Sequence, residues 1–130
     1  MLVRIILTCS AILLLVLPGI AEDCRELEFG AREALLRQAP TCDKAMELFG
    51  SCNAGGSGDI NLGQIVTEKC EATFLQRLSA GQRRSYNREM KNCNGEYKEG
   101  EGTLSRAMAA GCRALLAQSY AAKFGKPRLH

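Results

Sequence analysis

The sequence predicts an all-α domain, a small bundle of four to five short helices stapled by three disulfides. Apolar residues recur three or four positions apart along most of the 130-residue chain, which is the spacing of one helix face. No stretch alternates between apolar and polar residues over a useful length, as a half-buried strand would. Six of the seven cysteines follow the N-terminal apolar run, and this even number predicts three disulfides in an exported chain.

Residues 1–21 have the plan of a secretory signal peptide. Arg4 supplies a positive start, Ile5 to Leu17 form an apolar segment, and small residues precede a cleavage point after Ala21. The apolar run is shorter than the roughly 20 residues that span a bilayer, which disfavours a membrane anchor. Cys9 lies too early in this segment for a lipidated cysteine and leaves with the leader. We therefore expect one secreted or periplasmic domain over residues 22–130, with a frayed basic tail from about residue 125.

Two helices are predicted before the first glycine-rich break. The first apolar stripe ends at Ala39-Pro40, and Thr41 is a plausible N-cap for the second. The first stripe consists of Cys24, Leu27, Ala31, Ala34 and Leu35, and the second of Cys42, Ala45, Met46, Phe49 and Cys52.

Three more helices are predicted after the break at residues 54–58. Asp59 stands where it could cap the third helix, and Ser79 and Gln82 have the spacing of a capping box before the fourth. Gly100-Glu101-Gly102 interrupts the fourth helix, and Thr103 can cap the fifth. The three stripes are Leu62, Ile65, Val66, Cys70, Phe74 and Leu78, then Tyr86, Met90, Cys93 and Tyr97, then Leu104, Met108, Cys112, Leu115 and Tyr120.

The six cysteines all lie on these stripes, so we expect each to face the core. In an antiparallel helical hairpin, residues equidistant from the turn face each other. Three pairs close the three predicted hairpins by this rule: Cys24–Cys52 centred on Gln38, Cys42–Cys70 centred on Gly56, and Cys93–Cys112 centred between Glu101 and Gly102. This is one of fifteen connectivities.

The cysteines could also pair differently or bind a metal ion. Cys70 and Cys93 are centred near Gly81, which would leave Cys42 to pair with Cys112. Zinc binding needs closely spaced ligands such as C-x-x-C, whereas nine residues separate the nearest pair here. We expect no metal site, and the two disulfide patterns stay open.

Charge is divided unevenly along the chain. Residues 22–76 contain ten acidic and five basic residues, whereas residues 77–130 contain four acidic and eleven basic ones. Two explanations fit this uneven distribution of charge. The two halves attract each other across solvated faces, or the basic half forms a surface for an acidic partner. The densest basic cluster is Arg77, Arg83, Arg84, Arg88 and Lys91, of which residues 84, 88 and 91 share one helical face.

The chain lacks the residues that most catalytic mechanisms need. Its single histidine is the last residue, so a serine or cysteine nucleophile has no visible base. The glycines at 55–58 are not followed by the lysine of a phosphate-binding loop. Carboxylate pairs such as Glu68 with Glu71 are common by chance on helices rich in Asp and Glu. We expect no enzyme, no cofactor and, for an exported chain without interleaved aromatic residues, no nucleic-acid partner.

One segment resembles a known family. Met90, Cys93, Tyr97 and Leu104 have the spacing of the M-x-x-C-x-x-x-Y-x-x-x-D-x-x-L core of the LprI-type lysozyme inhibitors, and Glu101 stands where the family usually has Asp. The resemblance implies a secreted or periplasmic, disulfide-containing helical protein that binds and blocks lysozyme. It also implies a continuous helix, which would put Cys93 and Cys112 roughly 28 Å apart. The resemblance and the pairing of Cys93 with Cys112 therefore compete.

The function that these observations favour is non-catalytic binding outside the cytoplasm, to a protein partner such as a lysozyme-type cell-wall hydrolase. An acidic surface would meet a cationic lysozyme, and its expected residues are Glu26, Glu28, Glu33 and Glu47. The alternative is an envelope-associated protein that binds an anionic polymer or a membrane surface through Arg83, Arg84 and Arg88. The sequence does not predict an oligomeric state.

Overall fold

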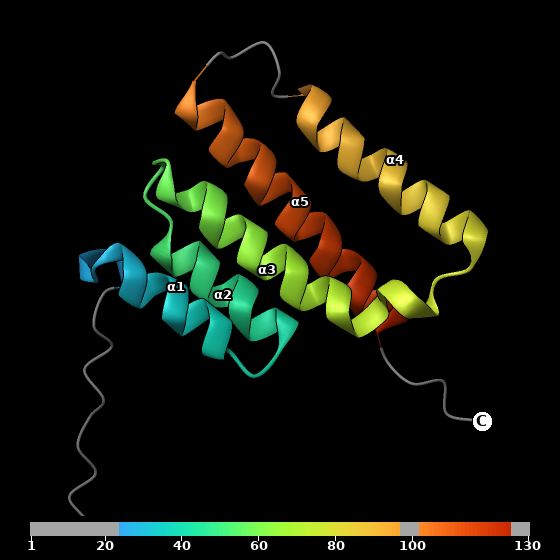
Figure 1. Cartoon of the computed structure of the whole chain (residues 1–130), viewed down its shortest axis with the longest axis horizontal. Helices are drawn as coiled ribbons and strands as arrows, with labels where there is room; N and C mark the ends of the chain where they lie inside the picture. Colours follow the sequence, from blue (N-terminus) through green and yellow to red (C-terminus); the bar gives the residue numbers. More distant parts are fainter. Residues whose placement is uncertain (1–23, 97–101, 126–130) are drawn as a thin grey trace, which may run out of the picture.

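The computed structural model describes residues 24–96 and 102–125. Every regular element in these ranges is helical, which confirms the all-α prediction (Figure 1). The predicted leader and the segment 126–130 of the basic tail lie outside the described residues. The elements are η1 (Cys24–Glu26), α1 (Phe29–Gln38), α2 (Cys42–Cys52), α3 (Gly58–Phe74), η2 (Leu75–Arg77), α4 (Ala80–Glu96) and α5 (Thr103–Phe124).

The centre of the bundle is the pair α3 and α5, which is the most extensive helix–helix contact. α1 and α2 pack on α3, and α4 packs on α5, so that α4 lies at the outer edge of the bundle (Figure 1). The apolar stripe predicted for α3 is confirmed, because Leu62, Ile65, Val66, Cys70 and Phe74 are all buried. α3 thus supplies much of the core.

The face of α5 that enters the core differs from the predicted one. Alanines fill it, whereas Leu104, Met108 and Leu115 are 61%, 48% and 57% exposed. The reason is the closeness of α3, since a Cβ built on Gly63 would lie 2.9 Å from the Cβ of Ala110. Large side chains do not fit between helices at this separation. The buried residues of α5 are Ala107, Ala109, Ala110, Ala114 and Ala117.

Replacing Gly63 by alanine is expected to destabilise the protein by up to about 2 kcal/mol. Alanine favours a helix over glycine by about 1 kcal/mol, but the new methyl would also lie 3.0 Å from the Ala110 carbonyl carbon and oxygen. Forcing the backbones apart costs about 1–3 kcal/mol. Urea unfolding monitored by circular dichroism measures the change. Gly50→Ala is the matched control, because Gly50 lies in α2 with nothing within 4 Å of its added Cβ, and this variant should be neutral or slightly stabilised.

α1 also buries a different face from the one expected. Ala31, Ala34 and Leu35 are exposed, whereas Leu36 is fully buried and Ala39 is nearly so. The predicted stripe assumed one continuous helix from Cys24, but the chain forms the short turn η1 and begins α1 at Phe29. This break changes which side of α1 faces the core.

Two of the four predicted caps are confirmed. The Thr41 hydroxyl oxygen accepts a bond from the backbone N–H of Lys44 at 3.1 Å. Ser79 and Gln82 form the reciprocal bonds of a capping box, at 2.8 and 3.3 Å. The prediction for Thr103 is wrong, since Gly102 occupies the N-cap of α5 and Thr103 is its first residue.

The prediction that Asp59 caps α3 is also wrong. Asp59 lies in the first turn of α3, and its buried carboxylate accepts bonds from the backbone N–H groups of Ala54, Gly55 and Gly56 at 2.6–3.2 Å. Gly55 has φ 77°, a conformation that favours glycine. Asp59 therefore orders the glycine-rich loop that precedes its helix.

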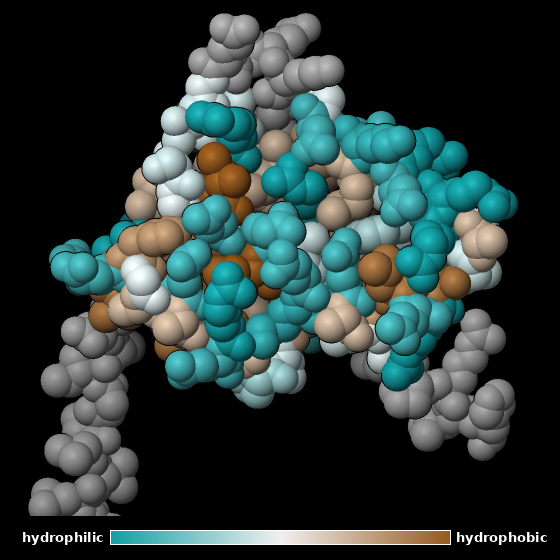
Figure 2. All heavy atoms as spheres, in the orientation of Figure 1, coloured by the Kyte–Doolittle hydropathy of each residue, from teal (hydrophilic) through white to brown (hydrophobic). Residues whose placement is uncertain are grey.

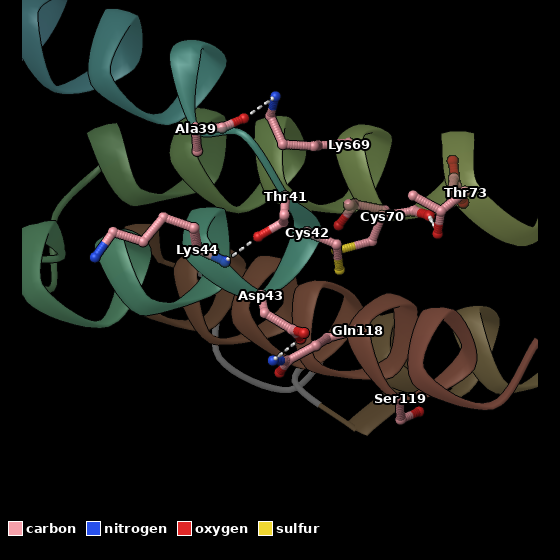
Figure 3. Close-up of a disulfide and its surroundings, with 12 residues drawn as sticks. Ala39, Thr41, Cys42, Asp43, Lys44, Lys69, Cys70, Thr73, Gln118 and Ser119 are labelled. Carbon is pink, nitrogen blue, oxygen red and sulfur yellow. Dashed lines mark hydrogen bonds between the residues drawn. A yellow bond between two sulfur atoms is a disulfide. The ribbon is translucent and has the colours of Figure 1, made fainter. Parts of the chain in front are cut away.

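The disulfides join Cys24 to Cys52, Cys42 to Cys70 and Cys93 to Cys112. These are the three pairs favoured by the midpoints of the predicted hairpins, and they exclude the alternative of Cys70 with Cys93. Five of the six cysteines are buried as expected, and Cys112 is half-buried. Around the Cys42–Cys70 bond, the Lys69 ammonium donates to the Ala39 carbonyl at 2.8 Å and the Gln118 amide donates to Asp43 at 3.0 Å (Figure 3). Side chains of α2 and α3 thereby contact α5 and the end of α1.

Candidate functional site

The outer face of α4 carries most of the predicted basic cluster. Arg84, Arg88 and Lys91 are exposed on one side of the helix, opposite the buried residues Tyr86 and Cys93. Three cations at positions i, i+4 and i+7 form a row about 10 Å long. We call Arg84, Arg88 and Lys91 the cationic row.

In the part of the chain that the structure describes, the cationic row is linked to a carboxylate only indirectly: the Arg88 guanidinium donates to the Ser85 hydroxyl at 3.2 Å, and this hydroxyl donates to Glu89 at 3.2 Å. Among the described residues, no carboxylate lies within ion-pair distance of these three head groups. The remaining exposed positions of α4 that the structure describes are Ala80, Gly81, Asn87, Asn92, Asn94 and Gly95, all uncharged. Most of the surface over α4 is hydrophilic (teal in Figure 2). The row is therefore a concentrated positive surface at the edge of the bundle.

Arg83 does not belong to this surface, contrary to the expectation from sequence. Its side chain is half-buried, and its guanidinium donates to the backbone carbonyl of Leu75. Residue 83 is rotated by about 100° from residue 84 on a helix, which turns it toward η2. Arg77 in η2 is exposed.

The acidic groups near α4 point inward and hold the helix in place. The Glu89 carboxylate accepts from the Tyr120 hydroxyl of α5 at 2.8 Å, and the Glu71 carboxylate of α3 accepts from the Tyr86 hydroxyl at 2.8 Å. The disulfide between Cys93 and Cys112 links the same two helices, α4 and α5. Because these carboxylates bond to tyrosines, the exposed charged residues of α4 that the structure describes are all cations.

The two tyrosines of this network are harder to ionise than free tyrosine. Burial, followed by the hydrogen bond to Glu71 and its charge, raises the pKa of Tyr86 well above the ordinary value near 10. Burial and the bond to Glu89 also raise the pKa of Tyr120. A phenol whose pKa is higher in the folded than in the unfolded protein stabilises the fold below pH 10, and this stabilisation is lost as pH rises past 10.

The free energy of unfolding is therefore expected to fall as pH rises above 10. In the Tyr86→Phe variant this decline should be smaller, although the lost hydrogen bond to a carboxylate should cost about 1–2 kcal/mol at pH 8. Urea midpoints measured between pH 8 and 11 test both statements. An unchanged decline in the variant would show that Tyr86 is not the group responsible.

The exposed apolar side chains of α5 form a second surface. Leu104, Met108 and Leu115 lie on one side of the helix, and we call them the apolar stripe. The first two line a hollow of about 220 Å³ between the start of α5 and the end of α2. Its other lining residues are Phe49, Asn53, Gly55, Asp59, Ala107 and Gly111. Sequence reasoning selected the members of the stripe but assigned them to the core.

A larger hollow of about 490 Å³ is lined by α1, the glycine-rich loop and the start of α3. Its lining residues include Phe29 and Arg32 of α1 and Asp59 and Asn61 of α3. The Arg32 guanidinium donates to the Cys52 carbonyl at 3.4 Å, whereas its buried Nε has no hydrogen-bond partner among the described residues. The N–H groups of Ala54, Gly55 and Gly56 already bond to Asp59. The N–H groups of the loop are thus already bonded, and an unpaired donor among the lining residues is the Arg32 Nε.

The four acidic residues expected to contact lysozyme are spread over three elements. Glu26 and Glu28 are exposed near the start of α1, whereas Glu33 is half-buried. Glu47 of α2 forms an ion pair with Lys44 at 2.7 Å. The structure therefore places Glu26 and Glu28 near one another in the chain but gives no single acidic face.

The segment that resembles the lysozyme inhibitors is not one helix. The Cα atoms of Cys93 and Cys112 are 5.6 Å apart, which a continuous helix between them excludes. Cys93 is buried in its disulfide, Met90 is half-buried and Leu104 is exposed. Tyr97 and Glu101 lie outside the described residues.

Comparison of the chain with protein-family models, with curated proteins and with solved structures finds no match to any of them. In the described ranges, no three His, Cys, Asp or Glu side chains form a group that could hold a metal ion. Likewise, none of the described helices is long and apolar enough to cross a bilayer.

Proposed function

We propose that this protein is exported through its N-terminal leader and is a non-catalytic binding protein that attaches to an anionic envelope polymer or surface through the cationic row of α4. The single observation that carries this proposal is the row itself: Arg84, Arg88 and Lys91 are exposed together, and none of them forms an ion pair with a carboxylate among the described residues. Such a surface attracts a partner with closely spaced phosphate or carboxylate groups.

The rest of the molecule is consistent with a scaffold that presents this surface outside the cytoplasm. Three disulfides are typical of proteins in an oxidising compartment. One of them holds α4, and the tyrosine–carboxylate bonds hold the same helix further along. A helix fixed at several points keeps its charges in register with a repeating polyanion, which lowers the entropy lost on binding.

Binding to heparin, a soluble polyanion, tests the proposal. The oxidised chain from residue 22 onward should bind at low salt and be released as salt rises, because exposed charges are screened. Replacing Arg84, Arg88 and Lys91 by glutamine should weaken binding roughly ten-fold or more. The dissociation constant can be measured by fluorescence anisotropy of labelled heparin.

The matched control removes three positive charges at other exposed positions. Arg37, Lys44 and Arg106 are exposed on α1, α2 and α5, and their replacement by glutamine should change the affinity for heparin by less than about three-fold. Equal losses in both triple variants would show that net charge alone attracts the polymer. Binding that is insensitive to salt would also overturn the proposal.

A second candidate, inhibition of lysozyme-type hydrolases, is favoured by the exposed pair Glu26 and Glu28, which have no ion-pair partner among the described residues. A titration of lysozyme activity with the oxidised protein should then show stoichiometric inhibition. A reduced and alkylated sample should not inhibit, and the double variant Glu26→Lys/Glu28→Lys should be weaker. Absence of inhibition across several lysozyme types would discard this candidate.

A further inference from the structure

We propose that the larger hollow, between α1, the glycine-rich loop and the start of α3, binds a small anionic ligand. A carboxylate or phosphate group of this ligand accepts hydrogen bonds from the Arg32 guanidinium, while an apolar part of the ligand lies against Phe29. The described residues that line the hollow belong to α1, the loop and α3, and none comes from α4. The hollow is therefore a second site, separate from the cationic row, and goes beyond the proposed function.

Arg32 carries a positive charge that the described residues satisfy only in part. A guanidinium has five N–H donors. One of them donates to the Cys52 carbonyl at 3.4 Å, and the buried Nε has no partner. No carboxylate lies within ion-pair distance of this half-buried side chain among the residues that the structure describes. Because a charge removed from water is stable only when it is paired or hydrogen-bonded, an anionic group in the hollow would stabilise the arginine.

The other charged residue that lines the hollow already has its partners. The Asp59 carboxylate accepts bonds from the backbone N–H groups of Ala54, Gly55 and Gly56, and both of its oxygens take part. A cationic ligand would have to compete with these bonds, which order the loop. Arg32 has more N–H groups than bonds, whereas both oxygens of Asp59 are engaged. The hollow therefore favours an anion over a cation.

Phe29 gives the hollow an apolar side chain next to this cation. Residues 29 and 32 are three positions apart, so they share one side of α1. The Phe29 ring packs on the start of α3, since a Cβ built on Gly58 would lie 2.7 Å from the ring carbon Cε2. The volume of about 490 Å³ lies in the range of about 300–1,000 Å³ that small-molecule sites have. A ligand larger than inorganic phosphate, with a flat apolar part, matches these features.

Carboxylate and phosphate are the groups that a guanidinium binds best. Its planar fork of N–H groups matches two oxygens of either group, and the resulting bonds are charge-assisted. The bond to the Cys52 carbonyl holds the fork, and Cys52 is in turn held by its disulfide to Cys24. A side chain that is anchored before the ligand arrives loses less entropy on binding. Arg32 is thus prepared to bind either group.

Phenyl phosphate and benzoate are the probes that test the inference, since each joins an anionic group to one aromatic ring. NMR titration of the isotope-labelled, oxidised chain from residue 22 should show saturating shifts of the Arg32 Nε–H signal and of the Gly56 and Gly58 amide signals, with a dissociation constant of about 1 mM. The probe that binds more tightly identifies the anionic group. Benzamide, which has the shape of benzoate without its charge, should bind about ten-fold more weakly or worse. Inorganic phosphate, which has no apolar part, should also bind more weakly than phenyl phosphate.

Three variants of α1 distinguish the site from general attraction by positive charge. Arg32→Gln should weaken binding of the tighter probe about ten-fold or more. Arg37→Gln is the matched control, because Arg37 is exposed on the same helix, and it should change the affinity by less than about two-fold. Arg32→Lys keeps the charge without the planar fork and should give an intermediate loss. The Nε–H signal of the unmodified chain answers the question even where a replacement of Arg32 disturbs the fold.

The outcomes that overturn the inference are distinct. They are an absence of binding, shifts of the loop amides without a shift of the Arg32 Nε–H signal, equal losses in Arg32→Gln and Arg37→Gln, and benzamide that binds as tightly as benzoate. Inorganic phosphate that binds as tightly as phenyl phosphate would overturn the contact of the ligand with Phe29.

The variants of the cationic row show that the two sites are separate. The triple variant of the cationic row should bind the probes normally, and Arg32→Gln should keep its affinity for heparin within about three-fold. Loss of probe binding in the triple variant would place the probe on α4. That result would overturn the small-ligand site and leave the proposed function standing.

Discussion

Replacing Phe74 by alanine is expected to lower the free energy of unfolding by about 3–5 kcal/mol, the usual cost of removing a large buried aromatic side chain. Phe74 is fully buried at the end of α3. Its ring contacts Tyr86 of α4 edge to face at 5.2 Å and Tyr120 of α5 at 5.8 Å between centroids. Three helices therefore lose contacts together. Thermal unfolding should show a Tm lower by roughly 15–25 °C.

Two variants show whether this loss comes from the shared aromatic contacts. Phe74→Leu keeps most of the apolar volume and should cost about 1–1.5 kcal/mol. Gln76→Ala changes an exposed side chain two residues away and should be near neutral. If Phe74→Ala cost less than about 1 kcal/mol, the packing of α3, α4 and α5 around this ring would be wrong.

Replacing Cys42 and Cys70 together by alanine is expected to destabilise the protein by about 3.5 kcal/mol. The bond closes a loop with a sequence separation of 28, and the chain-entropy model gives about this value for such a loop. Both cysteines are buried, and alanine avoids burying a hydroxyl group there. For a domain of ordinary stability, 5–15 kcal/mol, this is a large fraction. Urea unfolding under non-reducing conditions measures the loss.

The bridge at Cys42 is reinforced by other contacts of the same helix. Thr41 caps α2, and Asp43 accepts from Gln118 of α5. The alanine variant should therefore stay folded at 25 °C, with native circular dichroism and a lower urea midpoint. A variant that is as stable as the unmodified chain would mean that the bond is not formed in the folded protein.

The disulfide pattern could be predicted from sequence because it depends on few variables. Each pair is symmetric about a turn that glycine or proline marks, so the midpoint rule needs the turn and the helix direction but no side-chain detail. The caps at Thr41 and Ser79 were predictable for a similar reason, since a cap is a contact between residues three positions apart. Contacts that depend only on nearby residues and on a marked turn can therefore be predicted from the sequence alone.

The orientation of α5 could not be predicted, because two of its faces are apolar. One carries Leu104, Met108 and Leu115, and the other carries alanines; periodicity gives both the same spacing. Hydrophobicity favours the larger side chains as the core. The choice depends on the distance to α3, where Gly63 and Ala110 bring the backbones together, and this is a long-range property. Because of this error, the sequence-based prediction placed the exposed apolar stripe in the core.

The hydrogen-bond partners of Asp59 and Arg83 could not be predicted from sequence for a similar reason, because they depend on the folded conformation. Asp59 could accept from N–H groups ahead of it or behind it, and the loop conformation decides in favour of the preceding residues. Arg83 and Arg84 are adjacent in sequence, but one turns to the Leu75 carbonyl and the other to solvent. The count of charged residues located the basic region in the sequence, whereas the orientation of α4 decides which of its basic residues are exposed.

The three disulfides divide the described chain into two covalent units. The first two bonds interlock, because Cys42 lies inside the loop closed by Cys24 and Cys52, and together they enclose residues 24–70. The third encloses residues 93–112. Among the described residues, no disulfide spans the stretch between these units, which includes the exposed Arg77. A protease cut there would leave an N-terminal and a C-terminal fragment joined by helix packing alone, whereas a cut inside either ring system would leave every piece attached.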